Sequence, residues 1–114
     1  MINFACRKIS LEDVFRCALN LKRTDFKILT VLFKQERPLS SLELSGLINL
    51  DRTTIQKSLK SLLGKGLVKR YQRNLVSGGY TYLYAVKAKE LIKQQVIDLL
   101  NAWCERVSNE LINF

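Results

Sequence analysis

A short stretch of the chain, residues 43–67, constrains the fold most, because it specifies two helices joined by a tight turn. Ser45 is small where two helices must approach closely, and Asn49 is of a type that tolerates the left-handed conformation ending a helix. Asp51 can cap the next helix, and Ile55 falls on the inner face of that helix. Such a compact pair is a helix-turn-helix, whose second helix enters the major groove of DNA.

Size and composition predict one ordinary globular domain over residues 1–114. The chain is 47% hydrophobic and 25% charged. No apolar run reaches the roughly 18 to 20 residues that span a bilayer. The first eight residues lack the order of a secretory signal, in which charge precedes a long apolar core. We therefore expect a cytoplasmic protein.

The cysteines and the absence of histidine exclude several chemistries. Cys6, Cys17 and Cys104 are far apart and form no CxxC pair, and the chain contains no histidine. Zinc sites of the Cys/His type and histidine-based catalysis are excluded. We expect three small, buried or half-buried thiols, with a redox switch as the alternative. Nothing assembles a nucleophile with a base, so we predict neither an enzyme nor a cofactor.

The net charge of +9 is concentrated in one segment. Residues 51–74 carry seven Lys or Arg against one Asp, whereas residues 86–114 carry four groups of each sign. Solubility alone does not require such clustering, and a polyanionic partner does.

Capping signals and apolar periodicity predict four helices before a change of period. Ser10 with Asp13 opens the first helix, which runs to about Leu19. Thr24 and Asp25 open the second, which stops before Pro38 and whose stripe we expect to be buried. Ser40 with Glu43 opens the third, which runs through Ile48, and the fourth covers residues 52–63. The stripe of the second helix comprises Ile28, Leu29, Leu32 and Phe33.

The remainder predicts a hairpin and a last helix. Residues 67–76 and 80–86 are rich in β-branched and aromatic types, and Ser77, Gly78 and Gly79 separate them as a turn. A hairpin directly after a recognition helix is a wing. The fold class is therefore α+β, mostly α: a winged helix-turn-helix with extra terminal helices. The helix-turn-helix covers about 40–64, the wing about 67–86 and a C-terminal dimerisation helix about 87–112.

These residues resemble the small, especially archaeal, winged-helix transcriptional regulators of the MarR and TrmB-like superfamily. The likeness rests on residues 43–55, on the Leu59–Arg70 segment with its Gly-Leu-Val, and on the alternating tyrosines after Gly79. The resemblance implies a regulator that binds double-stranded DNA. TrmB-like proteins often carry a C-terminal effector-binding domain, whereas this chain runs about 28 residues past the wing, which argues against sugar sensing.

One side of the fourth helix and the wing are the candidate DNA-binding surface. We expect Thr53, Gln56 and Lys57 to meet base edges, and Arg52 and Lys60 to meet phosphates or groove edges. The alternative is a merely solvated charged face. The other predicted contacts are Thr54 at the first turn, Lys69, Arg70 and Arg73 in the wing, and Asn74, Ser77, Gly78 and Gly79 near its tip. If about six basic groups meet phosphates, the log–log salt slope is roughly −5 per subunit.

Tyr80, Tyr82 and Tyr84 alternate onto one face of their strand. Packing of the wing against the body is favoured over stacking on unpaired bases.

The last helix has more apolar surface than one small domain needs. One row has coiled-coil-like spacing, and a second row lies beside it. We expect a homodimer in which the cover is the same helix, or the first helix through Leu11 and Phe15, of a second subunit. A monomer that folds this helix entirely onto itself is the alternative. The first row comprises Ile97, Leu100, Cys104, Val107, Leu111 and Phe114, and the second comprises Ile92, Val96, Leu99 and Trp103.

These features predict a dimeric, sequence-specific regulator that represses by occluding DNA. The alternatives are a sequence-tolerant nucleoid or chromatin protein and a winged-helix module that docks on transcription machinery. A small-molecule effector is possible, but no residue identifies one.

Overall fold

A computed structural model describes residues 2–114, and it groups their contacts into two compact units. Residues 22–89 form the unit with the helix-turn-helix and its sheet, and residues 1–21 with 90–114 form the other. The mostly helical α+β winged-helix fold is confirmed. That the whole chain acts as one domain stays a prediction.

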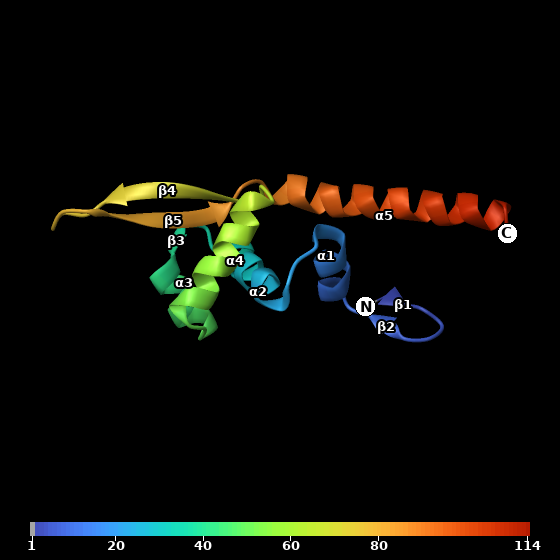
Figure 1. Cartoon of the computed structure of the whole chain (residues 1–114), viewed down its shortest axis with the longest axis horizontal. Helices are drawn as coiled ribbons and strands as arrows, with labels where there is room; N and C mark the ends of the chain where they lie inside the picture. Colours follow the sequence, from blue (N-terminus) through green and yellow to red (C-terminus); the bar gives the residue numbers. More distant parts are fainter. Residues whose placement is uncertain (1) are drawn as a thin grey trace. The chain divides into compact units, whose positions relative to one another are not determined.

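Three helices of the first unit pack around an apolar core (Figure 1). They are α2 (Arg23–Lys34), α3 (Ser41–Ile48) and α4 (Arg52–Gly64), close to the predicted bounds. The fully buried side chains of this core include Ile28, Leu29, Leu39, Leu44, Ile55, Leu59, Leu62 and Leu67. The expectation for Phe33 is wrong, because this side chain is only half-buried at the margin of the α2 stripe.

Local capping explains where the helices begin and end. Ser40 and Glu43 form the predicted capping box of α3, and Arg37 holds the Glu43 carboxylate at 2.6 Å. Asn49 ends α3 in the left-handed conformation, with φ 60° and ψ 45°. The Ser45 hydroxyl donates to the Leu50 carbonyl at 2.5 Å, which ties α3 to the turn.

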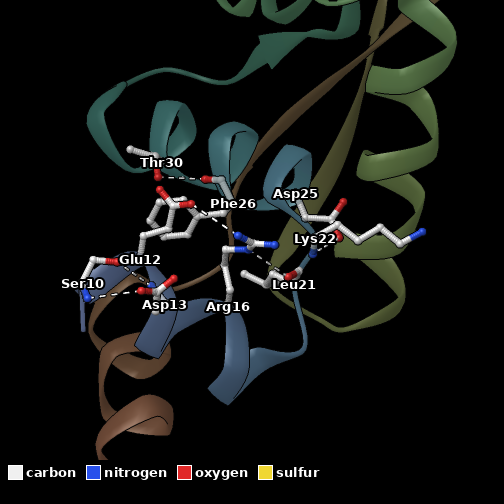
Figure 2. A network of polar contacts seen from close by, with 9 residues as sticks. All are labelled: Ser10, Glu12, Asp13, Arg16, Leu21, Lys22, Asp25, Phe26 and Thr30. Carbon is white, nitrogen blue, oxygen red and sulfur yellow. Dashed lines mark hydrogen bonds and ion pairs between the residues drawn. The ribbon is translucent and has the colours of Figure 1, made fainter. Parts of the chain in front are cut away.

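Helix α2 begins two residues earlier than predicted, after Lys22. The backbone N–H of Lys22 donates to the Asp25 carboxylate at 3.1 Å, as Figure 2 shows. Asp25 is buried, and this cap compensates part of the cost of burying its carboxylate. Across the core, the Ser58 hydroxyl of α4 donates to the Thr24 hydroxyl of α2 at 3.0 Å.

A three-stranded antiparallel sheet in the order β3-β5-β4 completes this unit. β4 (Val68–Asn74) and β5 (Tyr80–Val86) form the predicted hairpin, which we call the wing. The first wing strand ends at Asn74 rather than at residue 76, because residues 75–79 form the turn. The two-residue strand β3 (Leu39–Ser40) pairs with β5 and was not predicted.

The second unit holds α1 (Leu11–Leu19), most of α5 (Lys89–Ile112) and a small hairpin of β1 (Ile2–Asn3) and β2 (Lys8–Ile9). The Ser10 and Asp13 capping box of α1 is confirmed, and the Arg16 guanidinium lies 3.6 Å from the Glu12 carboxylate (Figure 2). The small N-terminal hairpin was not predicted.

The expectation of buried or half-buried cysteines is wrong. Cys6, Cys17 and Cys104 are all exposed free thiols. Cys6 lies in the bend between β1 and β2, and the other two lie on the uncovered sides of α1 and α5.

Candidate nucleic-acid interface

Helix α4 divides into a buried side and an exposed polar side. Ile55, Ser58, Leu59 and Leu62 are buried against the core. The opposite side is exposed, and we call its five residues the α4 polar face. At 100° per residue, all but the first lie within about 100° of one another around the helix axis. The α4 polar face comprises Arg52, Thr53, Gln56, Lys57 and Lys60.

One predicted contact, Thr54, takes part in the cap of α4. Its backbone N–H and its hydroxyl both donate to the Asp51 carboxylate, which caps α4. These hydrogen bonds, the hydroxyl's first, hold the pKa of Asp51 below its ordinary value. The side chain of Thr54 is half-buried rather than exposed, because it completes the cap.

The α4 polar face belongs to the more positively charged of the two units. The unit of residues 22–89 contains fourteen Lys or Arg and four Asp or Glu, a net charge of +10, whereas the other unit sums to −1. Asp25, Glu43 and Asp51, three of those four acidic residues, are engaged at helix starts. Within residues 2–114, no ion pair holds Arg52, Lys57 or Lys60. Their positive charge therefore faces solvent, as a polyanion site requires.

The register of the wing divides its basic residues between two faces. Arg70 pairs with Tyr84, Lys69 pairs with Ala85, and Arg73 pairs with Thr81. Paired residues share a face and successive residues alternate, so Arg70 lies on the tyrosine face while Lys69 and Arg73 lie on the opposite face. The sequence analysis had grouped all three as DNA contacts of the wing without dividing them between faces.

Two of these cations form cation–π contacts with tyrosine rings of the wing. The Arg70 guanidinium carbon lies 4.0 Å from the centre of the Tyr82 ring, and Lys69 Nζ lies 5.5 Å from that of Tyr71. Cation–π contact keeps the positive charge and limits the number of side-chain rotamers. The sequence analysis did not single out Tyr71, although Lys69 and Tyr71 are two residues apart on one strand and therefore share a face. The contact between Arg70 and Tyr82 could not be predicted, because it depends on the register of β4 against β5.

The alternating tyrosines lie on one face, as predicted. The ring centres of Tyr80 and Tyr82 are 5.3 Å apart, in an edge-to-face arrangement. Tyr84 is half-buried beside Leu39 of β3, so packing against the body holds for this end of the strand. Tyr80 remains exposed near the tip, where the predicted contacts Asn74, Ser77, Gly78 and Gly79 are exposed as well.

The predicted dimer contacts are largely uncovered in the single chain. Leu100 is 42% exposed and Trp103 is 59% exposed on α5. Val107 and Phe15 are half-buried, whereas Ile92 and Val96 of the second row are buried. The second row is therefore covered at its start only. The remaining predicted contacts, all exposed, are Leu11, Ile97, Cys104 and Leu111.

Among residues 2–114, no helix combines the length and apolarity needed to traverse a lipid bilayer. The same residues contain no group of three or more Cys, Asp or Glu side chains placed to hold a metal ion.

The family model described as "Sugar-specific transcriptional regulator TrmB" matches residues 15–90, two thirds of the chain. The chain belongs to the TrmB family. The matched residues contain the helix-turn-helix and the wing, so this protein is a transcriptional regulator with a winged-helix DNA-binding fold, and not an enzyme.

The chain is also similar to individual archaeal proteins over most of its length. An uncharacterized protein of Methanocaldococcus jannaschii is 32% identical over 95% of this chain and 88% of its own length. A possible transcriptional regulator from Methanosarcina mazei is 35% identical, with a TM-score of 0.85 over 100% of this chain and 96% of that one. A protein from Sulfolobus tokodaii is 26% identical, with a TM-score of 0.69 over 84% of this chain and 93% of that one.

The predicted resemblance to the MarR and TrmB-like superfamily is thus confirmed. The structure of MarR, 18% identical over 87% of this chain and 85% of that one with a TM-score of 0.53, shares the fold alone.

Proposed function

We propose that this regulator binds specific sequences of double-stranded DNA as a homodimer and represses transcription by occupying them. Helix α4 lies in the major groove, and the wing contacts the sugar-phosphate backbone and the adjacent minor groove. The observation that carries the proposal is the α4 polar face, a row of unpaired cations and hydrogen-bonding groups on the second helix of a helix-turn-helix.

The side chains of the α4 polar face suit base recognition. Thr53, Gln56 and Lys57 lie in the first half of α4, the part of a recognition helix that contacts base edges. Lysine can donate to guanine O6 and N7, glutamine can pair with adenine N6 and N7, and a threonine methyl can pack on thymine. Arg52 and Lys60 lie further around and along the helix, where they reach phosphates.

Exposed apolar surface on α5 supports the dimer. Leu99, Leu100 and Trp103 are exposed apolar side chains within one turn or so of α5, and clusters of exposed apolar side chains mark protein–protein contacts. A helix of 24 residues is about 36 Å long. A second copy, related by a two-fold axis, covers the row formed by Ile97, Leu100 and Leu111 and presents two recognition helices to a pseudo-palindrome.

Removal of Lys57, Lys60 and Arg73 together tests the proposal. In the variant Lys57→Ala, Lys60→Ala, Arg73→Ala, affinity for a duplex of about 30 base pairs, roughly three helical turns, falls by at least a hundredfold, because three phosphate or base contacts are lost. The log–log slope against salt becomes shallower by up to about 2.7 per subunit, or 0.9 for each lost phosphate contact.

The matched control is Arg7→Ala, Lys8→Ala, Lys93→Ala in the other unit, which leaves the same net charge of +6. This control keeps the wild-type salt slope and most of the affinity. Unchanged binding by the folded triple variant of the α4 polar face and wing would contradict the proposal and favour a protein-docking module. An equal loss of DNA affinity in both variants would show that binding depends on net charge alone.

A further inference from the structure

The tip of the wing is apolar and uncovered, although basic residues flank it. Residues 75–79 contain no charged side chain. Leu75 is 42% exposed, and Val76 is 109% exposed, so its side chain packs against nothing in the protein. Val76 therefore contributes nothing to the core, and its chemistry is available to a partner.

The turn that carries Val76 is ordered rather than loose. The Leu75 N–H donates to the Gly79 carbonyl at 3.0 Å, and the Gly78 N–H donates to the Leu75 carbonyl at 3.1 Å. Gly78 and Gly79 have φ of 96° and 78°, which other residues rarely adopt. Figure 1 shows β4 and β5 running away from α3 and α4 to this turn. Val76 is thus held at the apex of the wing.

The cations of the wing indicate the kind of partner that its tip binds. Arg70 lies on one face, and Lys69 and Arg73 lie on the other. A hairpin that lay flat on a single row of phosphates would use one face only. Arg73 is three residues from Val76, and the guanidinium of Arg70 reaches toward the tip over the Tyr82 ring. One cation on each face near the tip matches a groove with a phosphate row on each side.

The shape of the tip selects the minor groove. This groove is about 6 Å wide, which is too narrow for a two-stranded ribbon with its side chains. The two glycines have no side chains, so the turn is thinner than the strands behind it. The tip can enter while the flanking cations stay at the phosphates.

We propose that Val76 packs on the sugar edges and floor of the DNA minor groove and disfavours guanine there. This inference rests on the proposed DNA-binding function and adds a specificity-determining residue to it. An apolar side chain on the floor has no acceptor for the guanine 2-amino group, the one donor that G·C pairs present in this groove. The wing thereby prefers base pairs without that amino group.

Replacement of every guanine by inosine in a duplex of about 30 base pairs tests the inference. Inosine lacks the 2-amino group and keeps the major-groove atoms O6 and N7. The wild type should bind the inosine duplex roughly threefold to tenfold more tightly than the guanine duplex. Val76→Ser should bind the inosine duplex on the order of tenfold more weakly than the wild type, from the lost burial of one valine, and should not distinguish the two duplexes.

Salt dependence separates this contact from the charged ones. Val76→Ser should lower affinity equally at all salt concentrations, because no counterion is released by an apolar contact. Arg73→Ser, the matched control in the same wing, should make the log–log slope shallower by about 0.9 per subunit.

Equal affinities of wild type and Val76→Ser for both duplexes would overturn the inference and leave the proposed function intact. Loss of binding to anionic vesicles in Val76→Ser, with DNA affinity unchanged, would also overturn it and assign the tip to a membrane surface. Failure of the wild type to bind either duplex would defeat the proposed function itself.

Discussion

Asn49 sets the direction in which α4 leaves the helix-turn-helix. Its N–H donates to the Ser45 carbonyl at 2.9 Å, and its left-handed backbone turns the chain toward Asp51. An L-residue with a Cβ pays about 1 to 2 kcal/mol in this conformation, and asparagine pays less because its short side chain suits it. The turn at Asn49 and the cap at Asp51 thus set the orientation of the α4 polar face.

Substitution of Asn49 should therefore depend on backbone preference. Asn49→Ala should lower the free energy of unfolding by about 1 kcal/mol, because alanine disfavours the left-handed region. Asn49→Gly, the matched control, should leave it unchanged or slightly higher, since glycine adopts this conformation freely. Urea denaturation measures both. An alanine variant as stable as the glycine variant would show that the turn does not depend on this preference.

Helix caps and turn residues could be predicted from the sequence, because they depend on residues close together in the chain. Asn49, Asp51 and the two Ser-based capping boxes were predicted because each involves residues three or four apart. Thr54 was expected to be exposed and is half-buried, because its hydroxyl donates to the Asp51 carboxylate; that it contacts DNA stays a prediction. The sequence alone does not show how far this cap buries the side chain.

Among the elements, α1, α3 and α4 each have at their N-terminal end a carboxylate whose pKa is lowered. The Ser10 hydroxyl lowers the pKa of Asp13, the Arg37 guanidinium lowers that of Glu43, and the Thr54 hydroxyl lowers that of Asp51. Each folded-state pKa lies below the unfolded value of about 4. Their contribution to stability is therefore complete above about pH 4 and is lost as the pH falls through the lowered values.

Thermal unfolding between pH 5 and pH 3, a range that brackets the usual carboxyl pKa of about 4, measures this effect. The melting temperature of the wild type should fall as the pH decreases through this range. The variant Asp13→Asn, Glu43→Gln, Asp51→Asn should show a smaller decrease, because these caps no longer take up protons. Parallel curves for the two proteins would mean that the caps do not cause the acid sensitivity.

Sequence periodicity also has clear limits at this scale. Strand β3 was missed because Leu39 and Ser40 become a strand only by pairing with Tyr84 and Leu83, more than forty residues later. The division of the wing cations between two faces follows from alternation along β4 alone. Which of the two faces Arg70 shares with the tyrosines of β5 depends on the long-range register. Helices α2 to α4 were predicted closely because their apolar stripes recur within one segment.

In the whole molecule, charge and apolar surface are divided between the two units. The unit of residues 22–89 carries the excess positive charge, and α5 in the other unit carries the exposed apolar rows. This division fits one unit for DNA and one for a second subunit. Cysteine exposure was predicted wrongly at this scale, because burial on α1 and α5 depends on what covers each helix.

Charges placed on the apolar side of α5 test the proposed dimer. Leu100→Glu with Trp103→Glu should give monomers, because both side chains would be buried without a partner charge. Ala102→Glu with Asn109→Glu adds the same two charges roughly opposite that side and should remain dimeric. Sedimentation at matched concentrations compares the two. An unaltered dimer in the Leu100 and Trp103 variant would place the interface elsewhere.

Selection of random duplexes by the full-length protein, followed by sequencing of the bound fraction, tests sequence-specific recognition most directly. We expect enrichment of two related half-sites about 10 base pairs apart, bound at least roughly a thousandfold more tightly than random duplex at physiological salt. Binding without enrichment of any sequence would contradict it and indicate a sequence-tolerant nucleoid protein.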